Sequence, residues 1–324
     1  MLIRQCLILL MAPLIAGCAV DLVYPGTGTR PPASPPDHQV HPLTIEQAWP
    51  IELIDDRPFD ASGLLWWGEQ LLTVNDKGAT LYRVRFAPDG TRCHLQPWPE
   101  LFNRAELAQF AAEKVGRYDC EGIALAPDGR LFVCEEANRW VLGCDLSTGK
   151  VERLPIDWTP VADYLDARDL NASWEGIAIG NNRLYLANER KTGRIVVVDW
   201  ATRKVVDHFQ VRPAGRPFPD IHYSDLCWFE DSLWVLCRES QTVVRVHPGT
   251  KQILAEFSYR AVENDPEYRF KTPFTGTMEG LAVTATHIWL ATDNNGQGRV
   301  HHPKDTRPIL FRCRRPDVMV ETGN

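Results

Sequence analysis

A short phrase recurs along this 324-residue chain and constrains its fold more than any other feature. The clear copies are Asp119-Cys-Glu-Gly-Ile-Ala, Ser173-Trp-Glu-Gly-Ile-Ala and Thr277-Met-Glu-Gly-Leu-Ala, and the weaker copies are Ala61-Ser-Gly-Leu-Leu and Tyr223-Ser-Asp-Leu-Cys. Self-similarity at a period of roughly 50 to 60 residues predicts a propeller, a solenoid or an array. Alignment of the copies places one oxygen-bearing side chain at an equivalent position in each: Ser62, Glu121, Glu175, Ser224 and Glu279.

Each repeat contains four short apolar runs separated by turn residues, a layout typical of a propeller blade. The last repeat has only three runs, ending with Pro308–Cys313, while an unassigned strand candidate, Ala48–Ile54, precedes the first repeat. A strand from the N-terminus that completes the last blade would leave no open edge between the chain ends. The sequence therefore predicts an all-β fold, a five-bladed β-propeller over residues 43–316, closed by that N-terminal strand. Helical spacing is confined to residues 99–115 and, more weakly, 161–170.

The N-terminal residues have the features of an export signal. Arg4 is followed by a short apolar stretch that ends in Leu14-Ile-Ala-Gly-Cys18, which resembles a bacterial lipobox. We expect residues 1–17 to be a lipoprotein signal peptide and Cys18 to carry the lipid, with a plain signal peptide as the alternative. Residue 19 is alanine, which by resemblance to sorted lipoproteins favours the outer membrane. Residues 18–42 are rich in Pro and Gly and predict a tether, and residues 317–324 a C-terminal tail.

The aligned column predicts a metal site. In a propeller the first strand of each blade lines the central channel, so the five side chains would form an inward-pointing ring. Converging carboxylates repel one another unless they are protonated or matched by a cation. Oxygen ligands without His or Cys suit a hard ion, Ca²⁺ before Mg²⁺. The alternative is that the glutamates accept backbone hydrogen bonds and hold the blades in register.

A second acidic column follows the second strand of each repeat, with Asp76, Glu136, Glu189 and Asp293 in step and Glu239 one residue out of step. It is expected at the same mouth of the channel as the ring, and Asp76, Glu136 and Glu189 are candidate catalytic bases. Basic residues flank this column, and Arg139, Arg190 and Arg238 are candidates for binding an anionic group. The alternative for each is ordinary ion pairing at the ends of strands.

Other chemistries lack support in the sequence. The formal net charge of −7 argues against a nucleic-acid surface. No GxSxG, GxxxxGK[ST] or HExxH motif is present, so nucleophilic serine catalysis and nucleotide-loop binding are not indicated. Seven cysteines follow Cys18, an odd number without CxxC spacing, and most are expected to be small buried strand residues.

The phrase series also resembles known families. The stretches Ser62-Gly-Leu, Leu72-Thr-Val-Asn-Asp and Asp119-Cys-Glu-Gly-Ile-Ala-Leu are similar to the "esterase-like activity of phytase" domains and the SdiA-regulated bacterial propellers. The order Ser, Glu, Glu, Ser, Glu is similar to the calcium-activated nucleotidases (apyrases), where such residues hold a central Ca²⁺. The resemblance implies Ca²⁺ on Ser62, Glu121, Glu175, Ser224 and Glu279, and covers roughly residues 48–315.

Two functions from different classes remain open at this point. One is a metal-dependent phosphoester or ester hydrolase on the bacterial envelope, anchored to the membrane through Cys18. The other is a non-enzymatic propeller whose Ca²⁺ is structural and whose loop-rich face binds a protein or an anionic partner. Propeller folds host both.

Overall fold

The computed structural model describes residues 38–52, 59–76, 78, 80–98, 101–102, 104–110, 118–166, 168–169, 171–189, 193–214, 221–272 and 276–317. All of them fall within one compact unit, Pro36–Asn324. The predicted signal peptide, Cys18, most of the tether and tail, and Arg190 lie outside the described residues.

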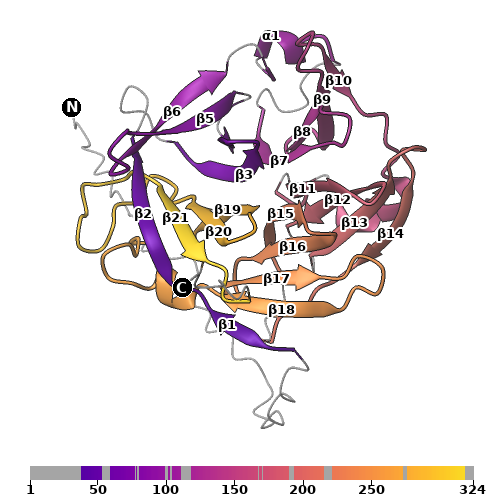
Figure 1. The fold of residues 1–324 in the computed structure, drawn as a ribbon. Helices are drawn as coiled ribbons and strands as arrows, with labels where there is room; N and C mark the ends of the chain where they lie inside the picture. The colour runs from indigo at the N-terminus through magenta and orange to yellow at the C-terminus, as the bar shows by residue number, and fades with distance from the viewer. Residues whose placement is uncertain are drawn as a thin grey trace, which may run out of the picture. The chain divides into compact units, whose positions relative to one another are not determined.

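Short antiparallel strands dominate the described chain, as the sequence predicts for an all-β protein (Figure 1). Two sheets have four strands each. One contains β7 (Cys120–Leu125), β8 (Leu131–Glu135), β9 (Trp140–Cys144) and β10 (Val151–Arg153). The other contains β11 (Trp174–Gly180), β12 (Arg183–Asn188), β13 (Arg194–Asp199) and β14 (Val205–Phe209). Within both, each strand pairs with the next along the chain.

The other two sheets recruit N-terminal strands. The five-stranded sheet contains β15 (Tyr223–Phe229), β16 (Ser232–Cys237), β17 (Thr242–Val246) and β18 (Ile253–Ser258), and β1 (Val40–Pro42) adds to β18 in parallel. The eight-stranded sheet has the order β19-β20-β21-β2-β6-β5-β4-β3. Its bounds are β19 (Met278–Val283), β20 (His287–Thr292), β21 (Ile309–Arg314), β2 (Ile45–Glu52), β3 (Ala61–Trp67), β4 (Gln70–Asn75), β5 (Leu81–Phe86) and β6 (Cys93–Trp98).

The strands β3, β7, β11, β15 and β19 contact one another in turn, and β19 returns to β3, so these first strands form a closed ring. Glycine in the repeated phrase makes this approach possible. A Cβ atom on Gly122 would lie 2.7 Å from the Ile177 nitrogen and 2.9 Å from the Gly176 Cα, and one on Gly63 would lie 2.5 Å from the Glu121 carbonyl oxygen. Any larger residue would push neighbouring first strands apart.

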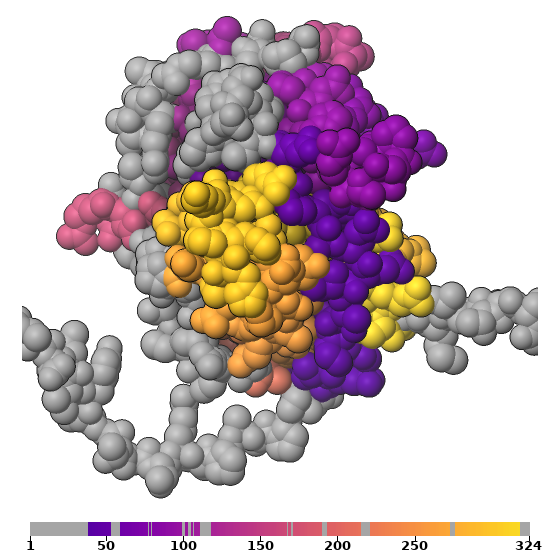
Figure 2. Space-filling view, turned by 90° about the vertical axis from the view of Figure 1, so that its left-hand side faces the viewer, coloured from indigo at the N-terminus to yellow at the C-terminus, as the bar shows by residue number. Residues whose placement is uncertain are grey.

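The N-terminal strand pairs with the last strand, as the sequence predicts. β2 is antiparallel to β21 and, at its far end, pairs in parallel with β6. In Figure 2 the indigo N-terminal residues lie against the yellow C-terminal ones on this face. Trp49 stacks on Trp289 at a centroid distance of 5.8 Å, and its indole N–H donates to the Gly90 carbonyl at 2.7 Å. Trp49 therefore ties the last and first repeats together.

Helical structure is short and lies between sheets. The described helices are α1 (Arg104–Leu107), α2 (Arg260–Glu263) and the 3₁₀ helix η1 (Thr159–Tyr164), so the described part of 99–115 contains a single helical turn. Among the described residues no helix is long and apolar enough to cross a membrane. All seven cysteines of the described region are free thiols; six are buried and Cys227 is half-buried.

Candidate functional site: an acidic centre at the ring of first strands

Each of the five aligned residues lies at an irregularity of its strand. The pairing of β3, β7, β11, β15 and β19 with the following strand shifts register at the repeated phrase in every case. A β-bulge bends the strand and re-aims the side chain that it contains. The five side chains are 2% to 7% exposed: Ser62, Glu121, Glu175, Ser224 and Glu279. The repeated phrase is thus the sequence of a bulge that buries one oxygen-bearing side chain per repeat.

The second acidic column lies directly beside the first. After four of the second strands, the next residue donates its backbone N–H to a backbone oxygen. The acceptor is the residue just before the first strand of the same repeat. The bonds are Glu136 to Asp119 (2.8 Å), Glu189 to Ser173 (3.1 Å), Arg238 to His222 (3.2 Å) and Asp293 to Thr277 (2.8 Å). Arg238 therefore holds the position that the acidic residues hold elsewhere, and Glu239 beside it forms an ion pair with His222.

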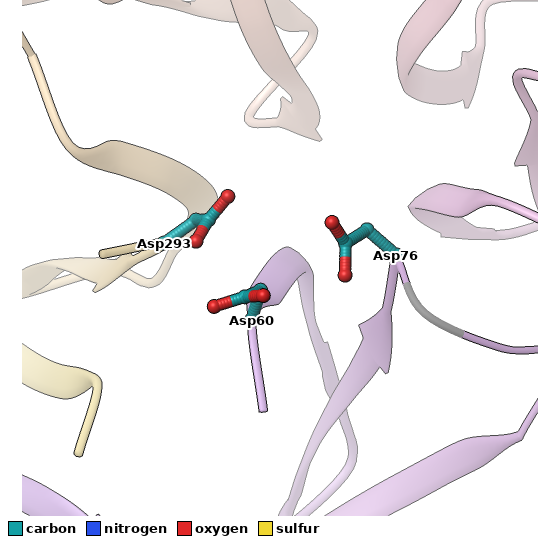
Figure 3. A group of neighbouring side chains, drawn as sticks. All are labelled: Asp60, Asp76 and Asp293. Atoms are coloured by element: carbon teal, nitrogen blue, oxygen red, sulfur yellow. The ribbon is translucent and has the colours of Figure 1, made fainter. Parts of the chain in front are cut away.

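Carboxylates of the two columns, together with Asp60 and Asp119, gather into three groups. Within each group the ligand atoms lie within 4.8 Å of one another, and two of the groups share Asp76. Among the described residues, the three ring glutamates do not form such a group by themselves; Glu121 and Glu175 each join carboxylates outside the ring. The groups, which we call together the acidic centre, are Asp60, Asp76 and Asp293; Asp76, Asp119 and Glu121; and Glu136, Glu175 and Glu189. Figure 3 shows the first group, with its carboxyl groups around a common space.

Arg238 places its positive charge among the buried carboxylates of this region. Its guanidinium forms ion pairs with Glu279 and, at 2.6 Å, with Glu189, and its side chain is 20% exposed. Burial opposes the charge of Arg238, but Glu279 and Glu189 raise its pKa well above the ordinary value. One arginine therefore joins a ring carboxylate to a carboxylate of the second column.

Three other carboxyl groups of this region have raised pKa values, the direction expected for buried acids close to one another. Burial, and then Glu136 and Asp119, raise the pKa of Glu121. Burial, and then Glu189 and Glu136, raise the pKa of Glu175. Burial, and then a hydrogen bond between its protonated carboxyl group and Asp60, raise the pKa of Asp293 to about 9. Such a region needs protons or a cation, and its oxygen-only ligands can hold a hard metal ion.

Three acidic residues of this region escaped the sequence prediction. Asp60 and Asp119 lie two residues before the ring position, and polar residues hold that position in every repeat, with Ser173, His222 and Thr277 in the others. This third polar column is a signal that could have found them. Asp225 replaces the glycine of the phrase, and that substitution is its signal.

Asp225 is fully buried, and its carboxylate connects different repeats through hydrogen bonds. Its Oδ2 accepts the backbone N–H groups of Leu281 at 2.7 Å and Leu64 at 3.2 Å, and its Oδ1 accepts that of Leu226 at 2.8 Å. Burial raises the pKa of Asp225, although these three hydrogen bonds oppose the rise. The carboxylate thus joins β15 to both β19 and β3 across the ring.

Arg139 lies beside the acidic groups, close enough to Glu136 for that carboxylate to raise its pKa against the effect of burial. It is half-buried with a φ of 61°, and its guanidinium donates to the backbone oxygen of Asp166. It lines a cavity of about 450 Å³ next to η1. The structure therefore brings together Asp76, Glu136, Glu189 and Arg238 with the ring, places Arg139 outside it, and does not describe Arg190.

A closed ring of first strands from repeated antiparallel sheets, with buried carboxylates at their bulges, defines a protein of the β-propeller type. The chain belongs to the phytase-like family, whose model, described as "Esterase-like activity of phytase", matches residues 60–296. A search of curated proteins found no match.

A comparison with solved structures found matches at low sequence identity. Glutaminyl cyclase from Myxococcus xanthus is 15% identical, with a TM-score of 0.57, and the match covers 86% of this chain and 98% of that one. Virginiamycin B lyase from Staphylococcus aureus is 14% identical, with a TM-score of 0.40, covering 78% of this chain and 65% of that one. A luciferin-regenerating enzyme is 11% identical, with a TM-score of 0.45, covering 82% and 94%.

Proposed function

We propose that the eight-stranded sheet represents two blades, which makes the domain a five-bladed propeller. Two four-stranded antiparallel runs, β3 to β6 and β19 to β21 with β2, meet only at the parallel pairs Ile51–Cys93 and Glu52–His94. Each run begins with one of the five ring strands. Support for the count is that every ring strand then opens its own four-stranded blade.

We propose that the acidic centre binds Ca²⁺. The ligands would come from the ring residues, with Glu121 and Glu175 shared with the second column. The carrying observation is that five bulges bury five oxygen-bearing side chains at one end of the ring, where burial and mutual repulsion raise the pKa of the glutamates. Oxygen ligands from flexible carboxylates suit Ca²⁺ better than the strict octahedron of Mg²⁺.

On this basis we propose a metal-dependent hydrolase of phosphate or carboxylic esters. The family description supports esterase-like chemistry. When bound, the ion would polarise the ester oxygen and lower the pKa of water. Glu136 and Glu189, which group with Glu175, would take the proton from that water, and Asp76, which groups with Glu121, would be the corresponding base there. Arg238 keeps Glu279 and Glu189 in position through its ion pairs.

A second candidate is a propeller with a structural ion and no catalytic activity. The observation that favours it is that the carboxylate groups join residues of different repeats, because Glu136 and Glu175, like Asp76 and Asp119, belong to neighbouring ones. An ion bridging repeats would stiffen the ring and leave the surrounding loops to bind a protein or an anionic partner.

We also propose that the protein is a lipoprotein of the bacterial envelope, anchored through Cys18 and directed to the outer membrane. The support is the Leu14-Ile-Ala-Gly-Cys18 sequence followed by Ala19. Substitution Cys18→Ala should release the protein from the membrane fraction. Mass spectrometry of the mature N-terminal peptide checks the lipid directly, and an unmodified Cys18 would refute this anchor.

The function is tested by melting the mature protein in Ca²⁺, Mg²⁺ and EDTA while assaying p-nitrophenyl phosphate, bis-p-nitrophenyl phosphate, p-nitrophenyl acetate, nucleotides and phytate. A Ca²⁺-dependent melting shift with Ca²⁺-dependent turnover supports the hydrolase. A shift without turnover supports the structural ion. Glu175→Gln should reduce the shift, whereas Glu69→Gln, in an exposed turn, should not. Absence of any shift in the parent protein would refute the metal centre.

A further inference from the structure

A second candidate site lies beside the acidic centre, in the cavity of about 450 Å³ between the β8–β9 turn and the segment around η1. We propose that this cavity binds the oxyanion group of an aromatic ligand, with Arg139 on the anion and Trp140 and Trp158 beside the ring. Its volume is within the range of roughly 300 to 1,000 Å³ that is usual for small-molecule sites. The residues that carry the argument are Arg139, Trp140, Arg153 and Trp158.

Arg139 supplies the positive charge. Within the described part of the chain its guanidinium donates to a single group, the backbone oxygen of Asp166, which leaves most of its five N–H groups available. Burial lowers the pKa of Arg139 despite the carboxylates of Asp166 and Glu136 nearby. A partly desolvated guanidinium binds an oxyanion more strongly than a fully hydrated one, because the anion replaces less water.

The backbone holds Arg139 in this place at a conformational cost. Its φ of 61° is in the left-handed region, which a non-glycine residue rarely adopts. The backbone N–H of Arg139 donates to the backbone oxygen of Glu136 at 3.2 Å. The indole N–H of Trp158 donates to the backbone oxygen of Arg139 at 3.2 Å. The preceding residue is fixed as well, because the Asn138 N–H donates to Glu135 at 2.8 Å. The equivalent residue of another repeat, Gln241, has a similar φ of 56°, so this conformation belongs to the turn and fixes where the Arg139 side chain begins.

Two tryptophans give the cavity its affinity for an aromatic body. Trp140 is 6% exposed, and the Arg153 guanidinium lies 5.5 Å from its ring centroid. Trp158 is half-buried and packs on Trp174 at 4.7 Å. An indole fixed on one side by such packing presents a rigid surface on which a planar ligand can stack. Arg153 is exposed and adds a second cation at the cavity.

The cavity adjoins the acidic centre through one turn. Glu136, which groups with Glu175 and Glu189, lies three residues before Arg139 in the β8–β9 connection. The inference deepens the proposed function, on which it rests for the view that the bound molecule is a substrate. It then names the substrate class as aryl esters that carry an oxyanion, such as aryl phosphates.

The experiment measures binding without the metal, so that it is independent of hydrolysis. 2-Naphthyl phosphate, 2-naphthoate and 2-naphthol are titrated into the mature protein by calorimetry in EDTA. We expect both anions to bind saturably, and 2-naphthol at least about tenfold more weakly, because it lacks the oxyanion. Arg139→Gln should weaken the anions about tenfold and 2-naphthol less than twofold, and Arg139→Lys should be intermediate, because the charge is kept but the planar fork is lost.

Arg168→Gln is the matched control. It removes an equal charge from the chain just after η1, but its side chain is 90% exposed and does not line the cavity. Equal losses in both variants, or equal affinity for 2-naphthol and the phosphate, would overturn the inference in favour of general electrostatics or plain apolar binding. Absence of saturable binding would also overturn it. Binding in EDTA without turnover in Ca²⁺ would instead refute the hydrolase and leave the cavity as a binding site, provided that the variants melt like the parent.

Discussion

The region of buried carboxylates around the ring has two halves, and the negative charges are neutralised differently in each. Around β15 and β19, the Arg238 guanidinium lies between Glu279 and Glu189 and supplies a permanent positive charge. Around β3 and β20, Asp60 and Asp293 share a hydrogen bond, and burial, followed by Asp60, raises the pKa of Asp293 to about 9. At neutral pH the proton on Asp293 therefore removes one negative charge there, whereas Arg238 balances the charges of Glu279 and Glu189 on the other side.

This difference teaches where a metal ion can enter with least disruption. A divalent ion in the half around Asp60, Asp76 and Asp293 displaces a proton, which is released to the solvent. In the other half it would have to compete with an arginine that cannot be deprotonated. The half with the shared proton is therefore the expected entry point of the ion, and an ion bound by the whole ring would have to displace Arg238 from Glu279.

The largest expected effect comes from removal of the arginine. Arg238→Met leaves Glu189 and Glu279 buried without their cation, which should lower the free energy of unfolding by about 3 to 5 kcal/mol. Urea denaturation in EDTA measures the loss. Arg183→Met, which breaks the more exposed pair with Asp199, should cost at most about 1 kcal/mol. A loss for Arg238→Met no larger than this control would contradict the central role of Arg238.

The next effect is the dependence of metal binding on pH. Because the ion must displace protons from acids whose pKa is raised, Ca²⁺ should stabilise the protein more at pH 8 than at pH 5.5. At 100 times the dissociation constant the gain in unfolding free energy is about 2.7 kcal/mol. Melting at both pH values with a fixed excess of Ca²⁺ over EDTA tests this. A shift that does not change with pH would mean that no such proton is displaced.

A smaller effect concerns the proton itself. Because Asp293 keeps its proton in the folded state up to about pH 9 but loses it near pH 4 when unfolded, it lowers stability progressively as pH rises through this window. Asp293→Asn removes this contribution, so in EDTA the variant should gain on the parent protein by about 1 kcal/mol or more between pH 5 and pH 8. Urea denaturation at the two pH values provides the measurement, and parallel losses in both proteins would contradict the shared proton.

The smallest effect compares the two serines of the ring. The Ser62 hydroxyl hydrogen-bonds Glu121 and lowers its pKa against the effects of burial and neighbouring acids. Glu279 has Arg238 as well as Ser224 beside it. Ser62→Ala should therefore cost about 1 kcal/mol, and Ser224→Ala less, because the arginine remains. Thermal melting of both variants in EDTA can rank them, and the reverse order would mean that Arg238 does not support Glu279.

Much of this arrangement follows from local sequence. The phrase around Glu121, Glu175 and Glu279 predicts the first strands and the buried column, because the bulge and its glycine are encoded within a few residues. The N-terminal strand was predictable because the last repeat lacks one. A second pairing between distant segments was not predictable: nothing near Val40 indicates its parallel addition to β18.

The partners of individual side chains were also beyond local patterns. Arg238 was expected to bind a ligand, but its ion pairs depend on the register of β15 against β16, which places it rather than Glu239 in the acidic column. Asp225 looked like an imperfect copy of glycine. Only the packing of β15 against β3 and β19 explains why a carboxylate there is useful.

The pairing of β2 with β21 has a consequence for the time course of synthesis. β2 emerges from the ribosome soon after β1, yet its antiparallel partner β21 is the last of the described strands to be made. At roughly 5 to 20 residues per second, β2 waits on the order of 15 to 50 s for β21. Sheets such as β7 to β10 and β11 to β14 need only nearby partners and can form meanwhile. The ring thus remains open, with Trp49 lacking Trp289, until β20 and β21 have been made.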